Sequence, residues 1–361
     1  MSKIVIFCEN YTEIESTLYV AKHHCHDSLI TIVIPGFHDL LKFFQVINEK
    51  VFHSAINIIY LESYQPGRAQ ARGINKIPHV IPDIIRERRY LKEIWNKYFV
   101  QLAGCEVFFF SRGSSGFKFY LLKKLSKRHR LVYISHGPPY FSKYTPTNIV
   151  DLASLTISKL IYGRDAAVGK LPYIKGFLYI PDKFMKKEVD RVIDWTERNK
   201  IMKDFDLSQF RIFDAGKYSV IYFDEGLLER GFVTDKTTFS RELAKVFDVL
   251  GKYFPEKEIA RKYHPGHDSD QTLIKVGDIL PAFIPAELLY NENVKMYIGI
   301  CSASIANVEK GLAVSIADLI TFKNDEIRKG LKEGLIQMSK SRILFPKSLD
   351  EFEQIIIDMK Q

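Results

Sequence analysis

The chain has 361 residues, 46% of them hydrophobic, and a formal net charge of +9 at pH 7. This composition excludes an intrinsically disordered chain, and the length is enough for two domains of ordinary size. The positive balance favours an anionic partner, such as a phosphorylated ligand, an anionic membrane surface or a nucleic acid, without choosing among them.

The four cysteines have no paired spacing, which is typical of a protein from a reducing compartment. The N-terminus opens on an apolar segment that reads as a strand and is too short for a signal peptide. No apolar segment is long enough to span a bilayer. We therefore expect a cytoplasmic protein.

In the first half of the chain, short apolar segments alternate with longer amphipathic ones, which predicts a parallel α/β sheet. The predicted strands are Ile4–Cys8, Ile30–Ile34, Asn57–Leu61, Glu106–Phe110, Leu131–Ile134 and Ile174–Ile180. The predicted helices include Tyr90–Leu102, Phe117–Lys127, Ile149–Tyr162 and Phe184–Asn199. Between the first two strands, His23–Asp27 is more typical of a helix-to-strand connection than of a metal site, because consecutive side chains cannot all turn to one ion.

Two loops that follow these strands are candidate ligand sites. After Phe110, small residues at a predicted helix start leave backbone N–H groups for an anion or a sugar, and Arg112, Ser114 and Ser115 lie there. After Ile134 comes His136, which is placed to act as a general base near neutral pH. A plain tight turn and a histidine bonded to a neighbouring carbonyl are the alternatives.

A basic segment with interleaved aromatic residues lies in the predicted Tyr90–Leu102 helix and just before it. Its cations are Arg86, Arg88, Arg89, Lys92 and Lys97. Such a segment fits an anionic membrane face, although it is more often the solvated side of a helix. Because no nucleic-acid-binding signature accompanies it, we expect no nucleic-acid partner.

The polar stretch Lys200–Lys217 predicts the connection between two domains, and a second βα series follows it. Its strands are predicted at Ser219–Phe223, Glu258–Arg261, Asp278–Leu280, Val294–Ile300 and Val314–Ile316, with helices at Thr237–Tyr253, from Ile284–Glu287 and from Cys301–Ser304. Ser348 and Glu351 form a capping box that predicts the start of a last helix. The predicted domains are residues 1–205 and 206–345, followed by a C-terminal helix over 346–361.

The second half places three polar motifs at strand ends. Asp224 follows the first strand, Lys262 and His264 follow the second, and Ser302 follows a later one, with about 40 residues between successive motifs. Because parallel strands joined by βα units share one carboxyl edge, these side chains should lie together. Imidazole, ammonium and helix N–H groups suit a phosphate. Glu287, near another helix start, could accept hydrogen bonds from two ribose hydroxyls or simply favour the helix dipole.

These motifs resemble those of bacterial sialyltransferases and polysialyltransferases, enzymes of the GT-B type that use a CMP-activated sugar. Lys262-Tyr263-His264-Pro265 matches the family's His-Pro motif, and Gly299–Ser304 resembles its serine motif, with Ala303 where a second Ser or Thr is usual. Ile284–Leu289 is similar to its nucleotide-side helix. The likeness covers roughly residues 215–320.

The resemblance implies two Rossmann-like domains that face each other across a cleft, and an inverting transfer to a glycan hydroxyl that needs no metal and no cofactor. It implies donor contacts from Glu225, Gly226, Lys262, Pro265, Glu287, Ser302 and Ser304, catalytic roles for His264 and a base, and acceptor contacts from the N-terminal domain. By its letters, Asp224-Glu225-Gly226 fits the family's acidic motif and makes Asp224 the base. By position, His136 takes that role, and both candidates stay open.

Other activities fit the same pattern. A transferase that uses CMP-Kdo or CDP-glycerol would share the fold, and a UDP-sugar 2-epimerase shares the two-domain architecture. A basic module that only binds a membrane surface is the non-enzymatic alternative. The expected partners are a nucleotide-sugar donor and a glycan acceptor, with peripheral contact at the inner membrane surface.

Overall fold

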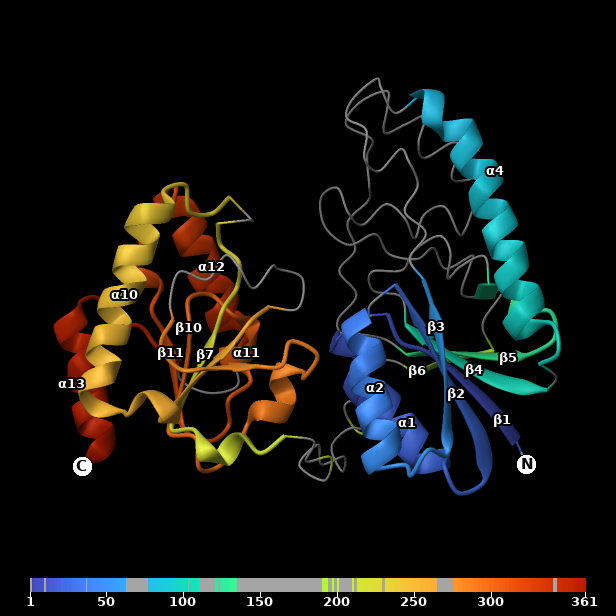
Figure 1. Ribbon diagram of the computed structural model, residues 1–361, viewed down its shortest axis with the longest axis horizontal. Helices are drawn as coiled ribbons and strands as arrows, with labels where there is room; N and C mark the ends of the chain where they lie inside the picture. Colours follow the sequence, from blue (N-terminus) through green and yellow to red (C-terminus); the bar gives the residue numbers. More distant parts are fainter. Residues whose placement is uncertain are drawn as a thin grey trace. The chain divides into compact units, whose positions relative to one another are not determined.

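The computed structural model describes residues 2–9, 11–36, 38–62, 77–102, 104–110, 121–122, 124–134, 190–193, 197, 200, 210, 213–228, 231–264, 275–339 and 343–361. The chain divides into two compact units, unit 1 (Met1–Asp206) and unit 2 (Leu207–Gln361). Each unit contains one β-sheet with helices packed against it (Figure 1).

Unit 1 contains a six-stranded sheet in which every described strand pairing is parallel. Its strands are β1 (Ser2–Phe7), β2 (Ser28–Pro35), β3 (Ile56–Leu61), β4 (Cys105–Phe110), β5 (Arg130–Ile134) and β6 (Arg191–Ile193). Their spatial order, β3-β2-β1-β4-β5-β6, is that of a Rossmann fold. The first five strands predicted from apolar content are confirmed.

Helices cover both faces of this sheet. On one face lie α1 (Ile14–His24) and α2 (His38–Lys50), and on the other lies α4 (Ile77–Ile94), which continues into one π-helical turn, Trp95–Phe99 (Figure 1). Leu91 and Ile94 of α4 pack against Val5 and Val107 of the central strands. Because α1 ends at His24 and β2 begins at Ser28, the predicted helix-to-strand connection is also confirmed.

Two predictions for unit 1 are wrong. Arg191–Ile193 was expected inside the helix Phe184–Asn199 but forms β6, which pairs in parallel with β5. Three residues carry too little periodicity to outweigh a helical pattern, and the pairing is a tertiary effect. The helix expected to begin at Tyr90 begins at Ile77 and contains Pro82 in its interior.

Unit 2 repeats the same architecture. Its strands are β7 (Val220–Phe223), β8 (Ile259–Lys262), β9 (Asp278–Leu280), β10 (Met296–Gly299), β11 (Leu312–Ser315) and β12 (Ile343–Leu344). The spatial order β12-β11-β10-β7-β8-β9 is again the Rossmann order when strands are counted from β7. Every residue of β7, β8 and β10 is buried, as expected for parallel strands covered on both faces. The second β-strand series is therefore confirmed, and β12 is a strand that the sequence analysis missed.

The helices of unit 2 are α10 (Lys236–Tyr253), α11 (Ala303–Ala306), α12 (Asp325–Met338) and α13 (Leu349–Lys360). Ser348 caps α13 by accepting a hydrogen bond from the N–H of Glu351 at 3.2 Å, and the Glu351 carboxylate accepts one from the N–H of Lys347 at 2.7 Å, so the predicted helix start is confirmed. The α-helix expected from Ile284–Glu287 is wrong, because only a four-residue 3-10 helix, Ala286–Leu289, forms there.

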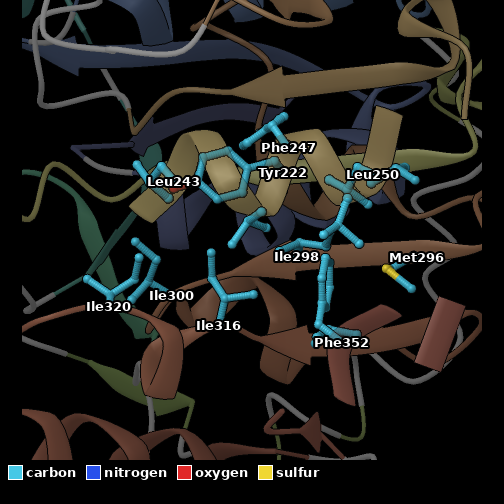
Figure 2. Close-up of a cluster of buried hydrophobic side chains, with 14 of the residues drawn as sticks. Tyr222, Leu243, Phe247, Leu250, Met296, Ile298, Ile300, Ile316, Ile320 and Phe352 are labelled. Carbon is cyan, nitrogen blue, oxygen red and sulfur yellow. The ribbon is translucent and has the colours of Figure 1, made fainter. Parts of the chain in front are cut away.

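The core of unit 2 lies on both faces of its sheet. On one face, α10 and α13 pack their apolar stripes against β7, β10 and β11, and Tyr222, Phe247, Ile298 and Phe352 meet there (Figure 2). On the other face, α11 and α12 contribute Ile305 and Leu335. Two independent apolar layers hold the strands in register, so the ends of the strands are fixed in position.

Candidate functional site

The carboxyl edge of the unit-2 sheet brings the predicted motifs together. β8, β7 and β10 are neighbours, and Phe223 pairs with both Lys262 and Gly299. The three strands therefore end at the same level, and Asp224, His264 and Ser302 follow them on adjacent strands. The expectation that these motifs share one edge of one sheet is confirmed. We call this region, with the residues that follow β8, β7, β10 and β11, the carboxyl edge.

Asp224, Glu225 and Gly226 form a tight turn after β7. Gly226 has a φ of +60°, which a residue without a Cβ adopts freely. The Asp224 carboxylate accepts a hydrogen bond from the N–H of Gly226 at 3.2 Å, and the Asp224 N–H donates to the carbonyl of Lys262 at 2.9 Å. Asp224 is half-buried, so its carboxylate is held in place while part of the side chain reaches solvent.

Glu225 bridges the ends of β7 and β10. It is only 4% exposed, and its Oε1 accepts hydrogen bonds from the N–H groups of Ile300 at 2.7 Å and Cys301 at 2.9 Å, while Oε2 accepts from Cys301 at 2.7 Å. A Cβ at Gly299 would lie 3.2 Å from Oε1, so glycine leaves room for this carboxylate. Strand order reverses between β7 and β10, which is where open α/β sheets bind ligands. An internal carboxylate therefore occupies N–H groups that would otherwise be open to a phosphate.

Lys262 is also engaged within unit 2. It is 3% exposed, and its Nζ donates hydrogen bonds to the carbonyls of Tyr263 at 2.8 Å and Ala282 at 3.1 Å. These bonds tie the end of β8 to the segment after β9. Arg261, on the opposite face of the strand, donates to the carbonyl of Gly277 at 3.4 Å. His264 is half-buried at the end of the described part of this loop, and Pro265 lies outside the described residues.

The segment after β10 opens the short helix α11. Ser302 is its N-cap and accepts a hydrogen bond from the N–H of Ser304 at 3.3 Å, so the helix start predicted at Cys301–Ser304 is confirmed. Tyr290 donates its hydroxyl to the carbonyl of Ser304 at 2.5 Å. Burial, with the nearby Glu225 carboxylate, raises the pKa of the Cys301 thiol. Cys301 is therefore neutral at physiological pH and is a poor nucleophile.

A charged cluster beside the end of β11 escaped the sequence analysis. Asp318 forms ion pairs with Lys332 and, at 3.5 Å, with Arg328, and both cations come from α12. Lys332 and Asp318 also act electrostatically on the Cys301 thiol, which places the cluster next to the β10 end. No motif marks these residues, since they converge only when α12 packs beside β11.

Several predicted site residues lie outside the described part of the chain. These are Arg112, Ser114, Ser115, His136 and Pro265, together with the side chain of Glu287. The backbone of Glu287 lies in the 3-10 helix Ala286–Leu289. β4 and β5, which precede the loops of Arg112 and His136, are confirmed as adjacent strands that end at Phe110 and Ile134. The roles of these residues stay predictions.

Unit 1 has a buried carboxylate at the position equivalent to Glu225. Glu9 and Glu225 each come two residues after the first strand of their sheet, and both are 4% exposed. The N–H of Glu9 donates to Oε2 of Glu13 at 2.5 Å, and Glu13 is fully buried. Burial, with the Asp39 and Cys8 charges adding to it, raises the pKa of the neighbouring Tyr11 hydroxyl. The ends of β1 and β7 are therefore both built around an interior glutamate.

A cavity of about 270 Å³ lies between α1 and strands β4, β5 and β6. Its polar lining includes His23, His24, Glu106 and Arg191. Burial, followed by the charge of His23, lowers the pKa of His24, although Glu106 opposes the shift. The cavity lies on a face of the sheet and contains none of the predicted site residues.

The described residues contain no cluster of three or more His, Cys, Asp or Glu side chains that could hold a metal ion. Within the same residues, no helix combines the length and the apolar character needed to cross a bilayer.

No protein-family model and no curated protein matches this sequence. Similar solved structures include a glycotransferase of kitacinnamycin, at 11% identity, with 99% of this chain and 90% of that chain covered and a TM-score of 0.43. TcCGT1 in complex with UDP is similar at 10% identity, 98% and 89% coverage and a TM-score of 0.44. UGT89C1 of Arabidopsis thaliana complexed with UDP is similar at 8% identity, 100% and 91% coverage and a TM-score of 0.41. The assignment of two Rossmann-like units rests on the strand orders of the two sheets.

Proposed function

We propose that this chain is a glycosyltransferase of the GT-B type. It transfers a sialic acid or a related nonulosonic acid from a CMP-activated donor to a glycan hydroxyl, in the synthesis of a surface polysaccharide or lipooligosaccharide. The observation that supports this proposal most is the convergence of Asp224, His264 and Ser302 on adjacent parallel strands at the carboxyl edge. The choice of CMP rests on the resemblance of the Lys262–Pro265 and Gly299–Ser304 motifs.

In this proposal unit 2 binds the donor. His264 and Ser302 stabilise the phosphate as it leaves, and Glu287 holds the ribose. Glu225 and Lys262 support the edge from within, because their described hydrogen bonds are to the protein's own backbone. Gly226 and Ser304 belong to the turns that present Asp224 and Ser302. Glu225 and Lys262 are buried, whereas His264 and Ser302 are half-buried, which supports this division for these four residues.

The reaction is a single displacement. An acceptor hydroxyl, positioned by Arg112, Ser114 and Ser115, attacks the anomeric carbon while the bond to the phosphate oxygen breaks. The hydroxyl proton passes to His136 or Asp224, and CMP leaves with the bonding electrons, which inverts the anomeric centre. An imidazole and N–H or O–H donors aimed at the phosphate stabilise its developing charge, so no metal ion is needed in this mechanism.

His264→Ala tests the proposal directly. Loss of a donor to the leaving phosphate should lower turnover about 10²–10³-fold. Because His264 is half-buried and follows the strand, the melting temperature should change little. His26→Ala, an exposed histidine of unit 1, is the matched control. Wild-type turnover of His264→Ala with a CMP-sugar and a glycan acceptor would remove His264 from the site.

The other candidate activities give different results in simple assays. A UDP-sugar 2-epimerase turns over its nucleotide sugar without an acceptor, whereas a transferase needs both substrates. A transferase that uses CMP-Kdo or CDP-glycerol is separated by the donor consumed. A purely membrane-binding module shows no thermal shift with CMP, CDP, UDP or GDP, whereas a ligand that binds the native state raises the melting temperature. The proposed function includes peripheral contact with the inner membrane surface.

A further inference from the structure

The outward face of α4 and its π-helical turn carries cations and apolar side chains together. Arg86, Arg88, Arg89, Lys92 and Lys97 are exposed on it. Ile85 and Val100, at opposite ends of the same stretch, are 48% and 42% exposed. At 1.5 Å per residue the stretch from Ile85 to Val100 is about 20 Å long. We call it the basic face.

Four of the five cations of the basic face form no ion pair within the described part of the protein, whereas the charge of Glu62 acts on Lys97, and Glu93, an exposed residue of the same helix, adds one negative charge. No acidic side chain among the described residues pairs with Arg86, Arg88, Arg89 or Lys92. Elsewhere on the surface, lysines form ion pairs, as Lys252 does with Glu353 at 3.0 Å and Lys217 does with Asp278 at 3.3 Å. The basic face therefore concentrates positive charge that is available to an external anion.

The inner side of α4 packs against the unit-1 sheet, which holds the basic face in place. Leu91, Ile94 and Phe99 are buried in the apolar core against the unit-1 sheet. Trp95 and Tyr98 are half-buried beside them; Lys124 lies over the Trp95 ring at 5.0 Å, and Lys97 lies over the Tyr98 ring at 4.9 Å. The aromatic rings therefore line the border between the core and the basic face, as in helices that rest at a membrane interface.

We propose that the basic face docks on the surface of an anionic lipid bilayer. Its arginines and lysines contact lipid phosphates, and Ile85 and Val100 enter the boundary between headgroups and acyl chains. The exposed apolar ends favour a bilayer over a nucleic acid, because a phosphate backbone gives no favourable environment for an isoleucine, whereas a bilayer interface does. This inference rests on the membrane contact included in the proposed function and assigns that contact to α4, whereas its test does not depend on which nucleotide sugar unit 2 binds.

Vesicle flotation with the full chain tests the proposal. Two vesicle compositions are used, pure phosphatidylcholine and a 70:30 mixture of phosphatidylcholine and phosphatidylglycerol. The wild-type protein should float with the anionic vesicles only and should be released as salt rises. Arg86→Gln, Arg88→Gln and Arg89→Gln combined should weaken the partition about 100-fold, from the typical effect of one basic residue near such a surface.

A second triple variant of equal charge is the control. Lys236→Gln, Lys245→Gln and Lys257→Gln remove three exposed lysines of unit 2 and should leave the partition within about twofold of wild type. Ile85→Gln, which leaves the charge unchanged, should weaken binding several-fold and should not alter its salt dependence. Activity on a water-soluble acceptor should be the same in all these variants.

Three outcomes would overturn the proposal. The first is equal flotation of wild type with neutral and anionic vesicles, or with neither. The second is equal loss in the two triple variants, which would assign binding to net charge and not to α4. The third is binding to a single-stranded oligonucleotide at a concentration at which anionic vesicles do not bind, which would assign the basic face to nucleic acid.

Discussion

Replacement of Glu225 should destabilise unit 2 far more than replacement of an exposed carboxylate. Its side chain accepts three hydrogen bonds from two N–H groups, that of the buried Ile300 at 2.7 Å and that of the half-buried Cys301 at 2.9 and 2.7 Å. Charge-assisted bonds of this kind contribute about 1.5–3 kcal/mol each, and a buried N–H left without a partner costs about 1–3 kcal/mol. Glu225→Ala should therefore lower the unfolding free energy by about 3–5 kcal/mol.

Glu225→Gln removes the negative charge of the side chain and keeps its size and shape. The amide keeps one oxygen for these N–H groups but turns an NH₂ group toward the other contact, so we expect a loss of about 2–3 kcal/mol. For a unit of this size that corresponds to a fall in melting temperature of about 4–12 °C. Circular dichroism on heating, read together with a urea titration, measures both quantities.

Glu242 provides the matched control, because its carboxylate also accepts from a backbone N–H, that of Thr321 at 2.8 Å, but in a solvent-exposed position. Glu242→Gln should cost less than about 1 kcal/mol. Equal effects of Glu225→Gln and Glu242→Gln would refute the reasoning. If Glu225→Gln kept the wild-type melting temperature but lost affinity for CMP, Glu225 would be a ligand contact and not an internal support.

The remaining predictions concern pH, backbone conformation and a helix cap. Burial, followed by the charge of Arg128, lowers the pKa of His129, whose Nδ1 accepts a hydrogen bond from the N–H of Cys105 at 3.2 Å. As pH falls, the unfolded chain therefore binds a proton at this histidine more readily than the folded chain does. The stabilisation that neutral His129 gives to unit 1 should be fully present above about pH 6.5 and should be lost as pH drops below it. His129→Leu should flatten this slope in urea titrations from pH 5 to 7.5, and an unchanged slope would contradict the assignment. Gly277 has a φ of +83°, and a Cβ there would lie 2.6 Å from the carbonyl oxygen of Ile259. Gly277→Ala should therefore lower the unfolding free energy by about 2–4 kcal/mol. As the control, Gly251→Ala, in α10 with open space around it, should raise the unfolding free energy by about 0.5–1 kcal/mol. Ser348→Ala should cost about 1 kcal/mol in thermal unfolding through loss of the α13 cap, and Ser348→Gly only a few tenths; similar losses for both would point away from the cap.

The central strands and the shared carboxyl edge were predictable from the sequence because each signal is local. Continuous apolar segments such as Val220–Phe223 predict buried parallel strands, and Ser348 with Glu351 predicts a helix start. The fold class follows from the alternation of these elements, which both sheets confirm. The pairing of β6 and the shortness of α11 depend on tertiary packing and leave no periodic trace.

The contacts of the candidate site were less predictable. The role of Glu225 depends on β10 lying beside β7, although more than seventy residues separate them in the sequence. Lys262 looks like a phosphate ligand in the sequence, yet its ammonium group is buried and bonded to two carbonyls. Arg328 and Lys332 meet Asp318 only after α12 packs beside β11. The choice between His136 and Asp224 as base stays a prediction.

The interior glutamates at equivalent positions of the two sheets affect how genetic screens of this protein should be interpreted. Loss-of-function substitutions at Glu225, at Glu9 or at Glu13 are expected to appear alongside those at His264. Substitutions of the three glutamates would act by reducing the amount of folded protein, and substitutions of His264 would act by impairing the chemical step. Measuring cellular abundance beside product formation would separate these two classes of inactive allele.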